Sequence, residues 1–528
     1  MPDSPDVLLE RAARYYQARA FEAAASCALV ILAQDAAHFD ALHLLGVLSL
    51  NKGQSADAVG YLTRAARVRP NDGAIPFALG NAFAALHLHE QAIAAYRRAP
   101  ANEQVLNNLG AALRHAGRTG EAIETFRRVL ARQPHFAPAW FNLGESLAAA
   151  EQWEEAITAF RAALTHAAPD TAAERLARIA IALANALVEL DRVEAARAAC
   201  EAMRTRFPDN PALIWHAGLA ALHLGDYRSG WRDYEARFLV PGHDPPRADA
   251  SMPDISALAG KRVLLLGEQG RGDVLQFVRY APLLAERGAT VHLSVTDDLK
   301  PLLSGMDGVS TVIGEDEAEP PYDIVTPVMS LPHAFGTTLE TVPNRVPYLR
   351  APASRISAWR DRLAAVAALH VGLCWASTNP GPRRGTDLET LRPLLDCPGV
   401  RIHALQKAIP DGDRACLHRH PAVQDHSADL TDFAETAALI EALDLVISID
   451  TAVAHLAGGL GKPVWIMLPH VAEWRWLRGR GDSPWYPSAR LFRQPAPGDW
   501  AGLTDAIATA LSRAVASPDT LERDQRLR

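Results

Sequence analysis

Small and large hydrophobic residues recur at helical spacing through the first third of the chain. A glycine is followed 12 residues later by Ala and 16 residues later by Leu, Tyr or Phe, and this pattern begins at Gly46, Gly80, Gly110 and Gly144. Successive copies start 34, 30 and 34 residues apart. This spacing predicts amphipathic helices, and a repeating unit of two helices predicts a solenoid whose neighbouring units bury each other's apolar faces.

The repeat length and the position of the small residues resemble the tetratricopeptide repeat, a pair of antiparallel helices. Pro70 and Pro134 stand where a second helix should end. Weaker copies on both sides extend the predicted all-α solenoid over residues 1–238, with about seven repeats. Such an array offers a concave surface to a protein acceptor or partner, although it can also serve as a scaffold or a dimerisation arm.

Three asparagines on the first helices of the repeats are candidates for a protein-acceptor groove. Asn107, Asn108 and Asn142 carry amides that can both donate to and accept from the backbone of a bound peptide. Solvation of an exposed helix surface is the alternative interpretation of each asparagine.

The pattern changes near residue 240. Four prolines between residues 241 and 253 predict a linker over residues 239–259. Beyond it, short apolar runs alternate with helical segments, which predicts parallel sheets with crossover helices in two Rossmann-like lobes, 260–355 and 356–528. The predicted strands are Arg262–Leu266, Val291–Val295, Thr311–Ile313, Asp323–Thr326, His370–Cys374, Arg401–Ala404, Leu445–Ile449 and Val464–Met467.

Composition argues against several classes of protein. The 53 basic and 61 acidic residues give a formal net charge of −8, whereas nucleic-acid binders usually carry a basic excess. The five cysteines form no C-x-x-C pair, which is typical of a reducing compartment. The charged N-terminal residues are unlike a signal peptide, and no apolar run reaches the roughly 18 residues of a membrane span. We therefore expect a cytoplasmic protein without a membrane span.

A glycine-rich loop follows the first predicted strand of the first lobe. Gly267, Gly270 and Gly272 precede a helix that is predicted to open at about Asp273. Glycines let backbone N–H groups approach a ligand closely, and the N-terminal end of a helix favours an anion. The spacing matches neither the dinucleotide-binding fingerprint nor a Walker loop.

A second loop follows a buried strand of the second lobe. Asp450 and Thr451 stand just past the end of this strand, and a short helix runs through His455. Open α/β sheets bind ligands at the carboxyl ends of their strands, so both loops are candidate ligand contacts.

Three segments together resemble the heptosyltransferases of glycosyltransferase family 9. They are Gly272-Asp273, Asp450-Thr451-x-x-x-His455, and the sequence GLCWAST at residues 372–378. The fusion to tetratricopeptide repeats is similar to the FlmG-like flagellin glycosyltransferases. The resemblance implies a GT-B fold, with an acceptor-binding first lobe, a second lobe that binds a nucleotide sugar, and a cleft between the two.

The resemblance also implies roles for single residues. Asp273 would be the general base that deprotonates the acceptor hydroxyl, and its alternative role is to cap the following helix. His455 would belong to the donor site or, alternatively, be a packed core histidine. Ala452 stands where the family usually has Gly, which argues against heptose as the transferred sugar. The implied donor-binding residues are Ser377, Thr378, Arg383, Arg384, Gln406, Lys407, Asp450, Thr451, Ala452 and His455. For the two arginines, an exposed solvated loop is the alternative.

Two further motifs favour a structural interpretation. Asp411-Gly412-Asp413 has the spacing of metal-using transferases, but its neighbours predict a turn, so no metal is expected. The aromatic residues Trp474, Trp476, Trp485 and Tyr486 are predicted to pack against the core, with stacking on a sugar or base as the alternative.

We therefore expect an inverting, metal-independent glycosyltransferase that moves a sugar from a nucleotide donor to a Ser or Thr hydroxyl of a protein held by the repeats. A flagellin-like protein is one candidate acceptor, and no cofactor is expected because the nucleotide sugar is itself a substrate. Two alternatives remain open. One is a transferase directed at saccharides or lipopolysaccharide, with repeats used for assembly, and the other is a non-enzymatic repeat scaffold with a degenerate transferase region.

Overall fold

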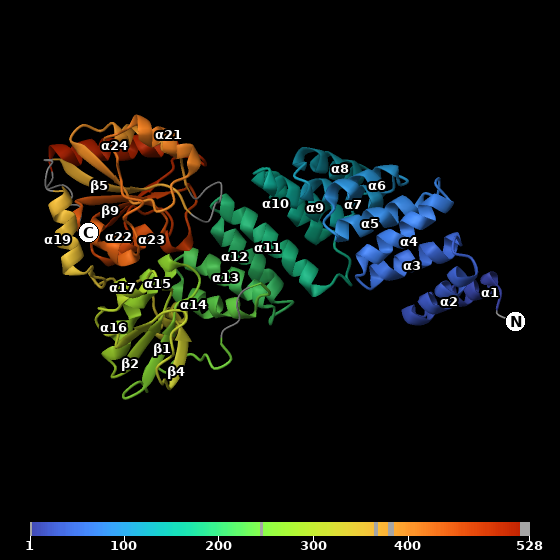
Figure 1. Cartoon of the computed structure of the whole chain (residues 1–528), viewed down its shortest axis with the longest axis horizontal. Coiled ribbons are helices and arrows are strands. Elements are labelled where there is room, and N and C mark those ends of the chain that lie inside the picture. Colours follow the sequence, from blue (N-terminus) through green and yellow to red (C-terminus); the bar gives the residue numbers. More distant parts are fainter. Residues whose placement is uncertain (1–2, 243–246, 364–367, 378–384, 518–528) are drawn as a thin grey trace. The chain divides into compact units, whose positions relative to one another are not determined.

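The computed structural model describes residues 3–242, 247–363, 368–377 and 385–517 (Figure 1). The chain forms two compact units, Met1–Leu190 and Asp191–Arg528. Helices alone build the first unit, and parallel sheets with flanking helices build most of the second. Among the described residues, no helix is both long and apolar enough to cross a membrane.

The first unit is a succession of short helices connected by tight turns. They are α1 (Pro5–Gln17), α2 (Phe21–Gln34), α3 (Phe39–Asn51), α4 (Ser55–Val68), α5 (Ala74–Ala85), α6 (His89–Arg98), α7 (Glu103–His115), α8 (Thr119–Arg132), α9 (Ala137–Ala149), α10 (Trp153–Thr165) and α11 (Ala173–Glu189). This all-helical solenoid confirms the prediction made from the repeat period.

Close helix crossings explain the repeated glycines. A Cβ added to Gly80 would lie 2.4 Å from Cε1 of Tyr96, and one added to Gly110 would lie 2.6 Å from Cε1 of Phe126. The aromatic ring of the second helix therefore fills the space that the glycine of the first helix leaves open. Any larger side chain at the glycine would force the two helices apart.

The second unit begins with the last helices of the array. They are α12 (Val193–Arg204), α13 (Pro211–His223) and α14 (Tyr227–Tyr234), followed by the 3₁₀ turn η1 (Glu235–Leu239). Trp231 of α14 is 1% exposed, and its ring meets those of Phe277, Trp474 and Trp485 edge to face at 5.1–6.3 Å. Helices α13 and α14 therefore share the hydrophobic core of the sheet-containing region.

The first sheet has four parallel strands in the order β3-β2-β1-β4. In the register of the sheet, Leu266 at the end of β1 lies opposite Ser294 of β2 and Pro327 of β4. The carboxyl ends of three strands therefore meet at one edge, where the glycine-rich loop begins. The elements of this region are β1 (Arg262–Leu266), α15 (Arg271–Phe277), η2 (Val278–Tyr280), α16 (Ala281–Ala285), β2 (Thr290–Ser294), α17 (Lys300–Leu303), β3 (Thr311–Ile313), β4 (Ile324–Pro327), η3 (Val328–Ser330) and α18 (Leu331–Ala334).

The second sheet has six parallel strands in the order β10-β9-β8-β5-β6-β7. Its residues alternate between two cores, because Val446 of β8 packs with helix α22 on one face while Ile447 packs with α24 on the other (Figure 1). The elements are α19 (Ala353–Leu363), β5 (Leu369–Cys374), α20 (Arg392–Leu395), β6 (Val400–Ala404), α21 (Asp411–Arg419), β7 (Gln424–Asp425), α22 (Phe433–Ala442), β8 (Leu445–Ile449), α23 (Ala452–Gly459), β9 (Val464–Leu468), η4 (Trp474–Trp476), β10 (Ala489–Arg493) and α24 (Trp500–Ala516).

The parallel sheets confirm the predicted alternation of strands and helices. Strands β7 and β10 were not predicted, and the turn predicted at residues 411–413 is instead the start of helix α21. The Asp413 carboxylate accepts from the indole N–H of Trp375 at 2.8 Å and from the N–H of Leu388 at 2.9 Å. Asp413 therefore joins the start of helix α21 to Trp375 and Leu388, which both follow β5 in the chain.

Three histidines form a row across the edge of the second sheet. Nδ1 of His370 lies 2.9 Å from Nε2 of His403, whose Nδ1 lies 3.0 Å from Nε2 of His426. Burial, followed by the neighbouring histidines, lowers the pKa of His403 to about 3 from an ordinary value of 6.5. The middle ring of the row is therefore neutral near pH 7.

Candidate functional site

The glycine-rich loop connects β1 to α15 at the edge where the strands of the first sheet end. The N–H of Gly267 donates to the carbonyl of Ser294 at 2.8 Å, which continues the sheet by one residue. Gln269 has φ of +60°, a conformation that costs a non-glycine residue energy, and its side chain contacts the hydroxyl of Tyr234 at 2.9 Å. Helix α15 begins at Arg271, two residues before the position predicted from sequence.

Asp273 lies in the first turn of α15. Its Oδ2 accepts the N–H of Gly270 at 3.0 Å, and its Oδ1 is paired with the guanidinium of Arg475. The side chain remains 19% exposed. Capping of the helix, the structural alternative for this carboxylate, is therefore present together with an ion pair that the sequence did not predict.

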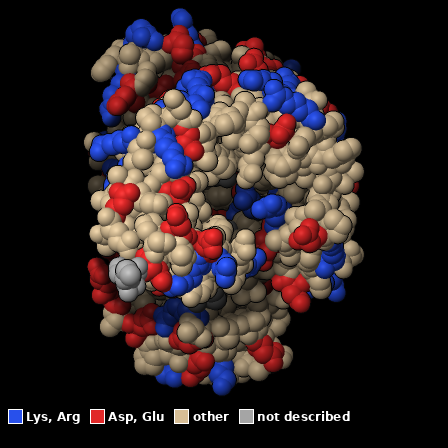
Figure 2. Space-filling model, turned by 90° about the vertical axis from the view of Figure 1, so that its right-hand side faces the viewer, with Lys and Arg blue, Asp and Glu red and all other residues tan. Residues whose placement is uncertain are grey.

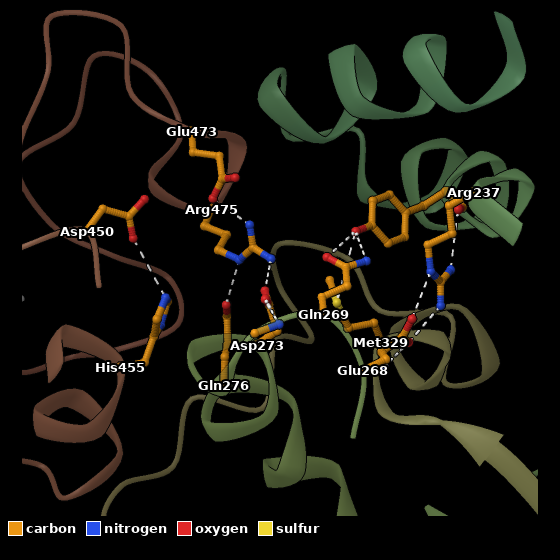
Figure 3. Close-up of polar contacts among 12 residues, drawn as sticks. Arg237, Glu268, Gln269, Asp273, Gln276, Met329, Asp450, His455, Glu473 and Arg475 are labelled. Carbon is orange, nitrogen blue, oxygen red and sulfur yellow. Dashed lines mark hydrogen bonds and ion pairs between the residues drawn. The ribbon is translucent and has the colours of Figure 1, made fainter. Parts of the chain in front are cut away.

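Arg475 is the central charged residue of this part of the molecule (Figure 3). It is buried, donates through Nε to Oε1 of Gln276 at 3.0 Å, and pairs with the carboxylates of Asp273 and Glu473. Its guanidinium also lies 4.2 Å from the ring centre of Trp474. Neighbouring carboxylates outweigh burial and raise the pKa of Arg475, so this side chain stays charged.

The second loop leads from β8 into α23. Thr451 is the N-terminal cap residue of α23 and Ala452 its first residue, while the hydroxyl of Thr451 lies 3.1 Å from that of Ser448. Nε2 of His455 lies 3.7 Å from Oδ1 of Asp450. The loop therefore holds its polar side chains close to the carboxyl end of the central strand.

His455 is packed from several sides. Its ring is 4% exposed, stacks on Trp476 at 5.4 Å, and places Nδ1 at 2.9 Å from the hydroxyl of Tyr486. Burial lowers the pKa of His455 well below its ordinary value, and Arg475 and Arg279 lower it further. The imidazole is therefore neutral, and its contacts are those of a residue that fixes the position of the loop.

The two loops contact each other directly. A Cβ added to Gly272 would lie 3.0 Å from Cδ2 of His455 and 3.5 Å from Cα of Ala452. Only glycine at position 272 permits this approach of α15 to α23 without a shift of the histidine ring. The sequence reasoning named both loops, and the structure brings them together.

A cavity of about 600 Å³ lies against the glycine-rich loop on the side of the first sheet. Loop residues Glu268, Gln269 and Gly270 line it, together with Ser294 and Thr296 after β2. The Glu268 carboxylate accepts from Nη2 of the buried Arg237 at 2.8 Å, which fixes one wall of the cavity. Burial raises the pKa of Glu268, and the charge of Arg237 opposes that shift.

The remaining predicted donor-site residues have different environments. Gln406 is 4% exposed and its Oε1 accepts the N–H groups of Trp375 and Ala376 at 3.3 and 3.1 Å, so it braces the segment after β5. Lys407 is exposed and donates to the carbonyl of Ser427 at 3.1 Å. Ser377 is half-buried just after β5. Thr378, Arg383 and Arg384 lie outside the described residues.

A row of asparagines lies along the first helices of the array in the first unit. Nδ2 of Asn142 donates to Oδ1 of Asn107 at 3.0 Å, and Nδ2 of Asn108 donates to Oδ1 of Asn81 at 3.0 Å. The hydroxyl of Tyr96 also donates to Asn81 at 2.8 Å. Asn81 was not predicted, because it follows Gly80 directly whereas Asn108 and Asn142 stand two residues before Gly110 and Gly144, so the repeat pattern does not mark it.

The aromatic residues near the C-terminus are buried. Trp474, Trp476, Trp485 and Tyr486 are each at most 3% exposed. They contact one another, α14, α15 and His455 of α23, as in packing against a core, so none of these four rings offers a free face to a sugar. Arg279 holds this cluster by donating to the carbonyl of Trp485 at 2.6 Å.

Charge is mixed on the surface of the molecule that Figure 2 presents, where acidic and basic side chains alternate without a large area of one sign. This distribution agrees with the small net charge of −8. Within the described residues, no group of three or more His, Cys, Asp or Glu side chains is placed to hold a metal ion.

Comparison with known proteins places the chain in a family. The sequence model of the tetratricopeptide repeat matches residues 43–105, 107–172 and 181–230. Protein FlbA of Caulobacter vibrioides is 30% identical over 549 residues, which cover 96% of this chain and 90% of FlbA. The chain belongs to the FlbA family. The alignment with FlbA therefore extends over the sheet-containing region as well as the repeats.

Solved structures that resemble the chain match a part of it. The crystal structure of MamA is 21% identical, has a TM-score of 0.30, and covers 31% of this chain and 93% of its own. The type IV pilus biogenesis factor PilW is 18% identical, has a TM-score of 0.36, and covers 40% of this chain and 96% of its own. Only FlbA, among these three relatives, is similar along nearly the whole length.

Proposed function

We propose that this protein transfers a sugar from a nucleotide donor to a Ser or Thr hydroxyl of a protein bound by the repeats, and that it does so with inversion and without a metal ion. In this proposal the glycine-rich loop and its cavity receive the acceptor, and the loop Asp450–His455 faces the donor. The two sheet regions would then be the lobes of a GT-B fold.

One observation carries the proposal: a partly exposed carboxylate, Asp273, stands on the loop that touches the second strand-end loop. Gly272 and His455 are in contact, so a group bound at one loop lies within reach of a group bound at the other. Each loop follows a parallel strand, which is where open α/β sheets bind ligands. The alignment with FlbA extends over the sheet-containing region and supports a role that the family shares.

The chemistry requires one base and no cofactor. The acceptor oxygen attacks the anomeric carbon, the bond from that carbon to the phosphate oxygen breaks, and the nucleoside diphosphate leaves with the bonding electrons. The hydroxyl proton passes to Asp273, whose two oxygens offer about four acceptor sites and use one for Gly270 and one for Arg475. A carboxylate in this position contributes about 10²–10⁴-fold to the rate.

In this proposal the repeats select the protein acceptor. The asparagine row Asn81, Asn107, Asn108 and Asn142 joins three successive first helices by amide hydrogen bonds, and Asn108 and Asn142 stand 34 residues apart at equivalent positions of the repeat. Amides that both donate and accept can follow a peptide backbone whatever its side chains. A flagellin-like protein is the acceptor we propose.

The test is an intact-mass measurement on the full chain. The protein is incubated with a flagellin and with a panel of nucleotide sugars, and we expect a sugar-sized mass increment on the flagellin. Asp273→Asn should lower the initial rate by about 10²–10⁴-fold while nucleotide binding by calorimetry is unchanged. Asp323→Asn is the matched control, because Asp323 also pairs with an arginine but at the opposite end of β1.

The array is tested separately with Asn108→Ala and Asn142→Ala. These variants should raise the KM for the protein acceptor and leave binding of the nucleotide sugar unchanged. Activity on a saccharide alone would overturn the protein-directed proposal. A wild-type protein that binds no nucleotide sugar and transfers nothing would instead favour the scaffold alternative.

A further inference from the structure

The Asp273 carboxylate depends on a short segment that is distant in sequence. Residues 473–478, which we call the connecting segment, provide Arg475 to Asp273. Arg475 is buried, and it makes its hydrogen bonds and ion pairs with Asp273, Gln276 and Glu473. The orientation of the candidate base therefore follows the position of the connecting segment (Figure 3).

The other end of the connecting segment is bound to the array. Arg478 donates through Nε to Oδ1 of Asp191 at 2.6 Å, and its Nη2 donates to the Asp191 carbonyl at 2.7 Å. Its Nη1 donates to Oε1 of Glu194, in the first turn of α12, at 2.8 Å. Several fixed donors on one guanidinium define a single orientation, which a flexible ammonium would not.

The backbone between the two arginines is also fixed. Nη2 of Arg493 donates to the carbonyls of Trp476 and Leu477, each at 2.7 Å. Leu477 has φ of +51°, an unfavourable conformation for leucine that these contacts maintain. A displacement of Arg478 is therefore passed to Arg475 rather than absorbed between them.

We propose that the connecting segment links the start of α12 to the Asp273 carboxylate, with Arg475 and Arg478 as positioning residues for sugar transfer. This inference rests on the proposed function for its catalytic part. It makes the turn before α12 a component of the catalytic apparatus, so that a partner that displaces this turn changes the rate of transfer without touching the substrates.

The test uses the full chain and removes the far anchor only. Arg478→Met keeps the length of the side chain and loses its donors, and Asp191→Asn keeps a residue type that tolerates the observed φ of +58°. Arg480→Met is the matched control. Arg480 is 32% exposed against 31% for Arg478, and it pairs with Asp482, two residues away, by a bidentate contact.

Two measurements are made on each variant. Transfer kinetics should show kcat lowered by about tenfold in Arg478→Met and Asp191→Asn with an unchanged donor KM, because a small displacement of a base lowers the rate and not the binding. Arg478→Lys should recover part of the loss. Hydrogen exchange should show faster exchange of the Gly270 amide, which the Asp273 carboxylate protects, in the same variants.

The outcomes separate this inference from the proposed function. Unchanged exchange at Gly270 and unchanged kcat in Arg478→Met would overturn the inference while the transferase proposal stands. An equal effect of Arg480→Met would also overturn it, since the loss would then reflect general weakening of the loop. If the wild type transfers no sugar, the proposed function fails, and the exchange of the Gly270 amide alone decides whether the link exists.

Discussion

Replacement of Trp231 tests whether the last helices of the array belong to the core of the second unit. The side chain is 1% exposed and touches five aromatic rings, those of Tyr227, Tyr234, Phe277, Trp474 and Trp485. Two of these rings lie on α14 itself, that of Phe277 lies on α15, and those of Trp474 and Trp485 lie between β9 and β10. Trp231→Ala therefore removes contacts on both sides of the junction.

The expected loss is large. Truncation of a buried Trp to Ala costs about 3–5 kcal/mol of unfolding free energy, and the edge-to-face contacts favour the upper part of that range. Domains are stable by about 5–15 kcal/mol, so the variant should remain folded but much weakened. With a urea slope of about 3 kcal/mol/M, the midpoint should fall by more than about 1 M. Trp231→Phe, which keeps a ring, should lose less.

The assay is urea unfolding of the full chain together with hydrogen exchange. Trp140→Ala is the control, because Trp140 is a half-buried ring of the first unit that is held by one hydrogen bond to the carbonyl of Pro134. In Trp231→Ala, exchange should accelerate in α15 around Phe277 as well as in α14. If only α14 loses protection, or if Trp140→Ala costs as much, the shared core that we describe is refuted.

Three further predictions concern single contacts. Gly272→Ala should lower the rate of transfer and cost about 1–3 kcal/mol in a urea titration, because the new methyl would press on the clamped His455 ring; a neutral result would mean that the loops can separate. Gly110→Ala should destabilise the array by a similar amount in thermal unfolding. Gly60→Ala is the control and should stabilise the array by up to about 1 kcal/mol, because no atom lies within 4 Å of the added Cβ. Equal effects of the two substitutions would contradict the close helix crossing at Gly110. The folded-state pKa of His403 is depressed to about 3, so between about pH 6.5 and 3 this residue is protonated in the unfolded chain and neutral in the folded chain. The contribution of neutral His403 to stability is therefore complete above that window and is lost as the pH falls through it. His403→Gln should lessen the fall of Tm between pH 7 and 4, and an unchanged dependence of Tm on pH would contradict this prediction.

Local patterns in the sequence were sufficient to predict most of the fold. Strands β1, β3 and β8 lie where the runs of β-branched and apolar residues predicted them. Strand β7 has two residues, too few to form a pattern, and β10 reads Ala-Arg-Leu-Phe-Arg without a β-branched residue. Such strands form because they pair with neighbouring strands of the sheet, and a local window of sequence does not contain those neighbours.

The site was predictable in part for the same reason. Asp273 and His455 each follow a strand closely and belong to family-like motifs, which made them candidates, and their roles in a site stay predictions. Arg475 is 202 residues from Asp273 along the chain, and its neighbours Trp474 and Trp476 give that segment the pattern of a buried aromatic cluster. A buried ion pair of this kind leaves no periodic signal in one sequence. Asn81 belongs to the asparagine row but gives no signal in the repeat, because its equivalents after the other glycines are Val47, Ala111 and Glu145.

The core that α13 and α14 share with the sheets limits where this chain can be recombined. A chimera that exchanges the repeats of two FlbA-family proteins would separate Trp231 from Phe277 if it were joined at the end of α14. Joined between residues 190 and 191, it would keep each compact unit entire. The repeats ahead of that point can be exchanged without dividing either compact unit. The three helices behind it are inherited with the site.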